Sequence, residues 1–165
     1  MAAALPPDAL VVLVGPSGSG KSTWAARSFR AADVLASDAF RALVGGDAAD
    51  QSATRDAFRL LHAAVRARLR RGLLTVVDAT NLTSGARSGL LRLARVADRP
   101  TVAIVFDTPL ERCLAQNARR PDRQVAEQVV RRQVAQLTGA RSRLAAEGFD
   151  AVHVVRAVST GEPLG

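Results

Sequence analysis

Lysine is almost missing from this chain of 165 residues. Lys21 is its single lysine, beside 22 arginines. Tyrosine is absent, and Phe and Trp make up only 4% of the residues, so no set of base-stacking aromatic side chains is visible. The single cysteine, Cys113, cannot form an internal disulfide, and its place in a helical pattern predicts a small core residue. Neither a Cys/His zinc cluster nor a Ser-His-Asp arrangement is present, and His62 and His153 are expected to be structural.

Long apolar runs are lacking too. No stretch approaches the roughly 18 apolar residues of a membrane span. The first eight residues carry no positive charge ahead of their apolar residues, unlike a secretory signal. Together with the single cysteine, these features predict a cytoplasmic protein with no membrane partner. The length and the 48% apolar content predict one domain over residues 1–165.

The net charge of +8 favours a polyanionic partner, nucleic acid above all. An arginine-rich composition that only raises the isoelectric point explains the charge about as well. The distribution of the charge along the chain has to decide between these interpretations.

The isolated lysine lies in Gly-Pro-Ser-Gly-Ser-Gly-Lys-Ser, directly after a run of five apolar residues. This segment matches the phosphate-binding loop G-x-x-x-x-G-K-[ST] between a strand and a helix. Backbone N–H groups of such a loop point at phosphate oxygens, Lys21 would reach the β- and γ-phosphates, and the Ser22 hydroxyl would bind Mg²⁺. The sequence therefore predicts a nucleoside-triphosphate site. The expected nucleotide-binding residues are Gly15, Ser17, Gly18, Ser19, Gly20, Lys21, Ser22 and Thr23.

Apolar runs and helical periodicity alternate along the chain. Strands are expected at 10–14, 33–37, 73–77, 101–106 and 151–155. Helices are expected at 21–30, 54–71, 84–97, from near Pro109, and up to about Gly148. The continuous apolar strands predict an α/β fold: a parallel sheet of about five strands between helices.

Aspartates stand at the carboxyl ends of the expected strands, where open parallel sheets bind their ligands. Asp38 lies three residues before Arg41, so on a helix the carboxylate could accept a hydroxyl proton while the guanidinium holds a phosphate. The alternative is a helix cap beside a solvated arginine. Asp78 follows Val76-Val77 and fits a Walker B acid, which would hold Mg²⁺. Asp107, ahead of Thr-Pro, is interpreted as a structural turn residue.

A basic segment at about 117–125 interrupts the helical pattern between two predicted helices. Arginines on a mobile lid can stabilise charge on a transferring phosphoryl group while closure excludes water. The plainer alternative is a solvated connection between two helices.

Taken together, these motifs resemble the polynucleotide 5′-hydroxyl kinase family, in particular the kinase module of bacterial RNA-repair end-healing enzymes. The likeness extends from about residue 10 to 155. It rests on the phosphate loop, Ser37-Asp-Ala-Phe-Arg41, Asp78-Ala-Thr-Asn81, Asp107-Thr-Pro109 and the Arg-x-x-Arg lid at 120–123.

The resemblance implies a P-loop kinase-like fold with an Arg-rich lid, and a role for each matching residue. Asp38 would be the general base for the 5′-hydroxyl, and Arg41 would grip the phosphate on the 3′ side of the terminal nucleotide. Arg120 and Arg123 would act on the donor phosphates, and Asp78 would contact the metal ion indirectly, through one of its direct ligands. Several relatives carry a basic residue where Gln116 stands, so the division of work among the lid arginines can differ here.

The expected function is therefore transfer of the γ-phosphate of ATP, or another NTP, with Mg²⁺, to the 5′-OH end of DNA or RNA. A small-molecule kinase acting on a sugar acid, nucleoside or antibiotic hydroxyl is the main alternative. A non-catalytic nucleotide switch fits less well, because no lysine is left to build the Asn-Lys-x-Asp motif that reads guanine.

Overall fold

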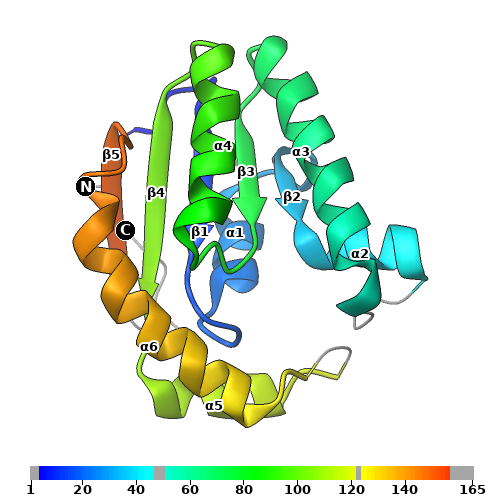
Figure 1. Cartoon of the computed structure of the whole chain (residues 1–165), viewed down its shortest axis with the longest axis vertical. Coiled ribbons are helices and arrows are strands. Elements are labelled where there is room, and N and C mark those ends of the chain that lie inside the picture. Colours follow the sequence, from blue (N-terminus) through cyan, green and yellow to red (C-terminus); the bar gives the residue numbers. More distant parts are fainter. Residues whose placement is uncertain (1–3, 47–50, 122–123, 157–165) are drawn as a thin grey trace.

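The computed structural model describes residues 4–46, 51–121 and 124–156 (Figure 1). Its five strands are β1 (Leu10–Val14), β2 (Val34–Ala36), β3 (Thr75–Asp78), β4 (Thr101–Asp107) and β5 (Ala151–Arg156). Its α-helices are α1 (Lys21–Ser28), α2 (Ser37–Gly45), α3 (Thr54–Arg70), α4 (Ser84–Val96), α5 (Leu110–Ala118) and α6 (Glu127–Leu144). Short 3₁₀ turns at Ala31–Asp33 and Gln51–Ala53 precede β2 and α3.

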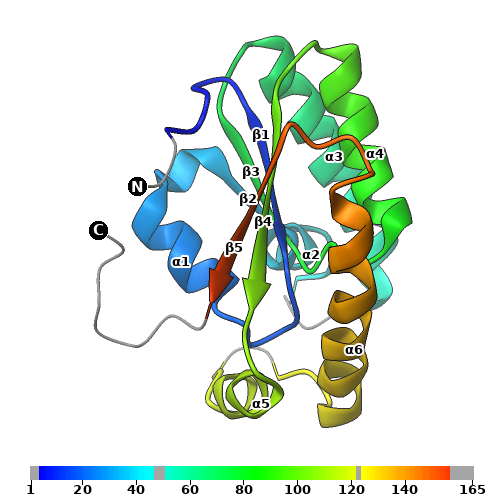
Figure 2. The same cartoon turned by 90° about the vertical axis from the view of Figure 1, so that its left-hand side faces the viewer.

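The strands form one parallel sheet in the order β2-β3-β1-β4-β5. Helix α1 covers one face, and α3, α4 and α6 cover the other (Figure 2). The predicted fold class, a P-loop kinase-like parallel sheet between helices, is confirmed. Within the described ranges, no helix is both long and apolar enough to cross a bilayer.

Strand β1 lies at the centre of the sheet and is buried on both faces. Its successive side chains point to opposite faces, so they divide between two cores. Leu10, Val12 and Val14 join the core beneath α3, α4 and α6. Val11 and Leu13 join a second core beneath α1. This explains why the run is wholly apolar rather than alternating, and it holds the loop after Val14 at the middle of the sheet edge.

Strand β2 is one residue shorter at each end than the sequence predicts. This strand is only three residues long, because Asp33 belongs to the preceding 3₁₀ turn and Ser37 begins α2. Asp38 therefore lies in the first turn of a helix rather than at the end of a strand. The β2 pattern is too short for periodicity to separate a strand end from a helix start.

Aromatic side chains anchor α1 on the sheet. The indole of Trp24 meets the rings of Phe29 and Phe106 edge to face, with centroids 5.5 Å apart in each pair, and so anchors α1 on the sheet. Cys113 is fully buried, and burial raises the pKa of its thiol to about 11, which makes it a core residue with little thiolate. His153, by contrast, is exposed on the edge strand β5.

Candidate active site

The loop between β1 and α1 has the backbone form of a phosphate cradle. Gly18 and Gly20 adopt left-handed conformations, with φ of 78° and 95°. A Cβ at Gly18 would overlap the carbonyl oxygen of Cys113 on α5, so only glycine fits there. Gly20 caps α1, whose first turn has no acidic residue to oppose an incoming anion.

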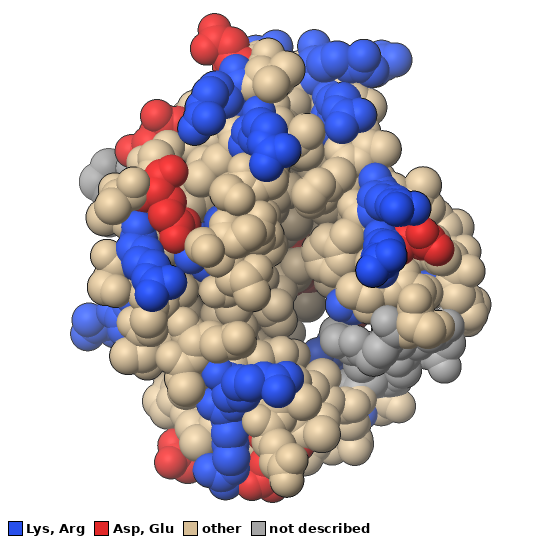
Figure 3. All heavy atoms as spheres, viewed as in Figure 1, with Lys and Arg blue, Asp and Glu red and all other residues tan. Residues whose placement is uncertain are grey.

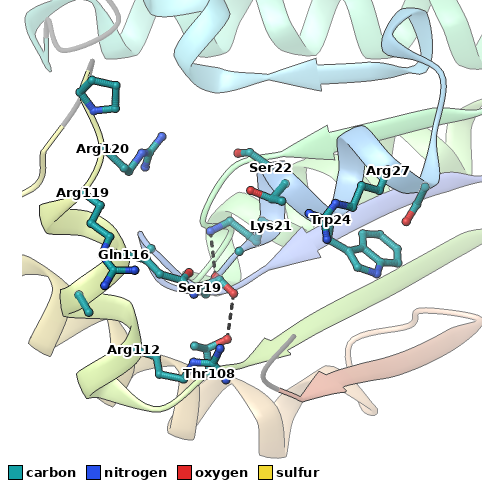
Figure 4. Close-up of a pocket in the computed structure, with 16 residues that line it drawn as sticks. Ser19, Lys21, Ser22, Trp24, Arg27, Thr108, Arg112, Gln116, Arg119 and Arg120 are labelled. Atoms are coloured by element: carbon teal, nitrogen blue, oxygen red, sulfur yellow. Dashed lines mark hydrogen bonds between the residues drawn. The ribbon is translucent and has the colours of Figure 1, made fainter. Parts of the chain in front are cut away.

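Contacts from distant elements hold this loop in place. The backbone N–H of Gly15 donates to the carbonyl of Thr80, 3.0 Å away. The buried Ser17 donates its backbone N–H to Oε1 of Gln133 on α6 at 2.8 Å. Thr108 donates its hydroxyl to the carbonyl of Ser19 at 2.9 Å (Figure 4). Three elements remote in the chain therefore fix the predicted phosphate loop.

Lys21 is buried, and its ammonium group is turned onto its own loop. Nζ donates to the carbonyls of Gly15 and Pro16 at 2.9 and 2.8 Å, and it lies 3.4 Å from Oγ of Ser19. Burial lowers the pKa of Lys21 to about 8, against the opposing attraction of Asp78. An anionic group at the loop would supply the charge partner that this ammonium needs.

Ser22 and Asp78, the two residues expected at the metal site, are hydrogen-bonded to each other. Ser22 Oγ donates to Oδ2 of Asp78 at 2.7 Å across 56 residues of chain, from the start of α1 to the end of β3. In the described part of the chain no group of three or more His, Cys, Asp or Glu residues could hold a metal. One hydroxyl and one carboxylate suit Mg²⁺, which keeps several waters and takes further oxygens from a bound phosphate.

A cavity of about 640 Å³ opens beside this loop, between α1 and α5. Ser22 and Thr23 line it from α1, and Arg112, Gln116 and Arg120 line it from α5 and the residues beyond (Figure 4). Its volume is in the range of pockets that hold a small-molecule ligand or cofactor. The arginines make it a site for an anion.

Asp38 and Arg41, three residues apart on α2, form an ion pair. Arg41 Nη1 donates to Oδ1 of Asp38 at 2.6 Å within α2. The Arg41 side chain is only 9% exposed: Nε reaches Thr54 Oγ1 at 3.3 Å, and the guanidinium lies 5.9 Å from the centre of the Phe58 ring. Thr54 and Phe58 come from α3, and no sequence motif marks them as partners of Arg41.

Arg120 reaches the same carboxylate from the opposite side. Its Nη2 lies 3.4 Å from Oδ2 of Asp38, across 82 residues of chain. Arg120 and Asp38 both contribute to the electrostatic environment of the Lys21 ammonium, with opposite signs. The tertiary structure therefore brings together four of the predicted site residues: Lys21, Asp38, Asp78 and Arg120.

One asparagine joins the two ends, residues 117 and 125, of the segment that we call the lid. Asn117, buried at the end of α5, donates Nδ2 to the carbonyl of Val125 at 2.6 Å and accepts the Val125 N–H at 3.0 Å. Sequence reasoning placed Asn117 in the lid but did not identify this role. Arg123, predicted to act on the donor phosphates, lies outside the described residues, and its role stays a prediction.

Asp107 agrees with its structural interpretation, because its carboxylate pairs with Arg141 of α6 at 3.0 Å. The residue most clearly missed was Gln133. It lies in the middle of an ordinary amphipathic helix, and nothing in its neighbourhood indicates a contact with the phosphate loop.

A parallel sheet with a phosphate loop at its central strand and a hydroxyl–carboxylate pair beside it defines the P-loop kinase-like class. The chain belongs to the family described as AAA domain, which matches residues 10–144. None of the curated proteins compared with the chain matches it.

Solved structures share the fold. A chain of the Pnkp1/Rnl/Hen1 RNA repair complex superposes with a TM-score of 0.70 at 23% identity, covering 86% of this chain and 47% of that one. The AvrRxo1-ORF1:-ORF2 structure with ATP gives 0.71 at 19%, covering 93% and 56%. The APS kinase CysC of Mycobacterium tuberculosis, in complex with AMPPNP and APS, gives 0.56 at 17%, covering 94% and 92%. This chain thus spans about half of the first two chains and nearly all of the third.

Proposed function

We propose that this protein is a polynucleotide 5′-hydroxyl kinase, which transfers the γ-phosphate of ATP or another NTP to the 5′-OH end of DNA or RNA. The observation that carries the proposal is the Asp38–Arg41 pair, held beside the phosphate loop and contacted by Arg120 of the lid. A carboxylate between two guanidinium groups suits an acceptor that brings both a hydroxyl and a neighbouring phosphate.

On the donor side, the loop N–H groups and the α1 N-terminus would bind the β- and γ-phosphates. Lys21 would exchange its two carbonyl partners for phosphate oxygens. Ser22 and Asp78 would hold Mg²⁺, which neutralises charge on the donor phosphates. Arg120, already at the cavity edge, would stabilise charge on the transferring group once the lid is engaged.

On the acceptor side, Asp38 would accept the proton of the 5′-hydroxyl as its oxygen attacks the γ-phosphorus and the bond to the leaving NDP oxygen breaks. In the free protein both carboxylate oxygens of Asp38 face arginines. An incoming phosphate competes for Arg41 and Arg120, which leaves the carboxylate open to the hydroxyl. Binding of the acceptor would thus free the Asp38 carboxylate to act as the base.

The test is label transfer from γ-labelled ATP with Mg²⁺ to a 5′-OH oligonucleotide, with the same oligonucleotide already 5′-phosphorylated as the matched control. Label should appear on the first and not on the second. Transfer to gluconate or a nucleoside, but never to an oligonucleotide, would overturn the proposal.

A small-molecule kinase is the second candidate, favoured by one observation. The APS kinase CysC shares this fold over 94% of the present chain, and its structure is a complex with AMPPNP and APS. The same labelling assay, run with nucleoside and sugar-acid acceptors beside the oligonucleotide, separates the two candidates.

A further inference from the structure

A row of arginines extends along α3, starting at the turn that contacts the Asp38–Arg41 pair. Thr54, the first residue of α3, accepts the hydrogen bond from Arg41. We define the α3 arginine stripe as the four exposed residues that follow on one side of this helix: Arg55, Arg59, Arg66 and Arg70. Their spacings of four, seven and four residues keep all of them on one side of the helix.

The opposite side of α3 is apolar and buried in the core through Ala57, Leu61, Val65 and Leu69. The stripe is therefore the outer surface of a helix whose orientation the core already determines. At about 1.5 Å per residue, the 12 residues from Thr54 to Arg66 correspond to roughly 18 Å along the helix axis.

Helix α4 extends the basic surface. His62 of α3 lies against α4, where a Cβ added to Gly89 would come 3.3 Å from its ring. Arg92 follows Gly89 by one turn, as Arg66 follows His62. Burial lowers the pKa of His62, and the nearby charges of Arg66 and Arg92 lower it further, so both arginines act on one spot.

Little negative charge opposes this surface. Asp56 is the single acidic residue of α3, it pairs with Arg59 at 3.6 Å, and α4 contains no acidic residue at all. Arg66, Arg70 and Arg92 make no hydrogen bond or ion pair with any residue that the structure describes. Like charges four residues apart, as at Arg66 and Arg70, destabilise a helix unless an anion lies between them.

Figure 3 shows where these charges gather. Basic side chains crowd the end of the molecule over the C-terminal halves of α3 and α4, and the same face is hollowed below them, toward α5 and α6. Helix C-termini favour cations, which accounts for Arg70 in the last turn of α3. Arg66 and Arg92 lie before the last turns of their helices, so this effect does not explain them.

We propose that the α3 arginine stripe, with Arg92, binds the phosphate backbone of the polynucleotide acceptor several nucleotides away from its 5′ end. This inference rests on the proposed function. Phosphates spaced about 3.4 Å apart along a strand would place roughly the fifth or sixth phosphate beside Arg66 when the 5′ end lies at Asp38. Acceptor length, rather than base identity, would then govern affinity, because phosphate contacts carry no sequence information.

The experiment compares a 5′-OH trinucleotide with a 5′-OH 12-mer as acceptors. The test variant is Arg66→Gln/Arg92→Gln. The matched control is Arg132→Gln/Arg143→Gln, which removes the same charge from exposed positions on α6. Thermal unfolding of each variant shows that it is folded. For the wild type, the KM of the 12-mer should be roughly tenfold lower than that of the trinucleotide, and it should rise with salt.

In the Arg66/Arg92 variant, the 12-mer should lose most of this advantage, while kcat and the KM of the trinucleotide stay unchanged. The slope of log KM against log salt should fall by about 1.4, or about 0.7 for each single-strand phosphate contact removed. The control variant should keep the advantage of the 12-mer.

Two results would overturn the inference while leaving the proposed function standing: equal KM values for both acceptors in the wild type, or the same loss in both variants. Transfer to neither acceptor by a folded wild-type protein that binds ATP would instead overturn the proposed function, and this inference with it.

Discussion

The proposed donor and acceptor sides of the candidate site are built in different ways. The proposed donor side is made of backbone: a glycine-rich loop with a helix N-terminus, closed over a buried lysine. The proposed acceptor side is made of buried and partly buried side chains from three parts of the chain: Asp38 and Arg41 on α2, Thr54 on α3 and Arg120 beyond α5. The donor side can therefore be recognised from a short stretch of sequence, whereas the acceptor side depends on how the helices pack.

The difference also concerns charge. On the proposed donor side a cation is buried and its pKa is lowered, so an anion bound at the loop would stabilise its charged form. On the acceptor side a carboxylate is already paired with two arginines. Binding should therefore add charge partners on the donor side and exchange them on the acceptor side, and mutations should affect the two sides differently.

The largest effect is expected from Asp38→Asn. The amide keeps the shape of the side chain but cannot accept a proton, and general-base loss typically lowers the rate ~10²–10⁴-fold. Nucleotide affinity should barely change, because Asp38 faces the acceptor. Single-turnover kinetics and ATP binding measure the two effects. An unchanged transfer rate with abolished ATP binding would place Asp38 in the metal site instead.

Arg41→Ala tests the proposed acceptor side a second time. It should raise the KM for an oligonucleotide, since it removes a phosphate contact rather than the base. The effect should shrink for an acceptor that lacks the neighbouring phosphate. An equal effect on both acceptors would show that Arg41 only positions Asp38.

On the donor side, Lys21→Ala and Ser22→Ala should each lower kcat/KM. The fall should correspond to a loss of about 2–4 kcal/mol of transition-state stabilisation. Lys21→Arg should fail as well, because a planar guanidinium does not fit a loop that closes around a compact ammonium. Steady-state kinetics with matched circular dichroism spectra test this. A fully active Lys21→Arg enzyme would contradict the structure of the loop.

A smaller effect is expected from the asparagine that joins the two ends of the lid. Asn117→Ala removes both hydrogen bonds to Val125, and we expect it to reduce the free energy of unfolding by about 1–3 kcal/mol and kcat/KM roughly tenfold. Gln124→Ala is the control, because its hydrogen bonds to Ala118 and Arg120 are exposed. Denaturant titration and kinetics should separate the two variants, and equal effects would deny Asn117 a special role.

The smallest effect is a pH dependence of nucleotide binding. With a pKa of about 8 in the free protein, Lys21 loses its proton in mildly alkaline solution, and bound phosphates should raise that pKa again. ATP binding at about pH 8.5 should therefore take up as much as ~0.8 proton, and affinity should fall as the pH rises through 8. Calorimetry in buffers of different ionisation enthalpy measures this uptake, which Lys21→Ala should abolish.

The same pKa carries a consequence of opposite sign for folding. Between pH 8 and the ordinary lysine pKa of 10.5, the unfolded chain binds more protons at Lys21 than the folded one. The contribution of this group to the free energy of unfolding therefore rises with pH in that window. Thermal unfolding of wild type and Lys21→Ala across the window checks the sign.

The strand–helix alternation was readable because each strand next to the core is continuously apolar and each helix carries a periodic apolar stripe. The helix expected at 84–97 begins after Thr83, whose side chain caps α4 by accepting the Ala86 N–H. Boundary errors occurred at β2, where three residues are too few for a period, and at β3, which begins at Thr75 rather than at residue 73.

What the sequence alone determined about this protein is local: the phosphate loop, the position of its lysine, the i,i+3 pairing of Asp38 with Arg41, and the apolar faces of strands and helices. Such features depend on neighbours in the chain, whose geometry the backbone limits to a few forms. Only the tertiary structure joined Ser17 to Gln133, Ser22 to Asp78, and Asp38 to Arg120. These contacts span 56 to 116 residues of chain, and they exist because core burial fixes how the helices lie on the sheet.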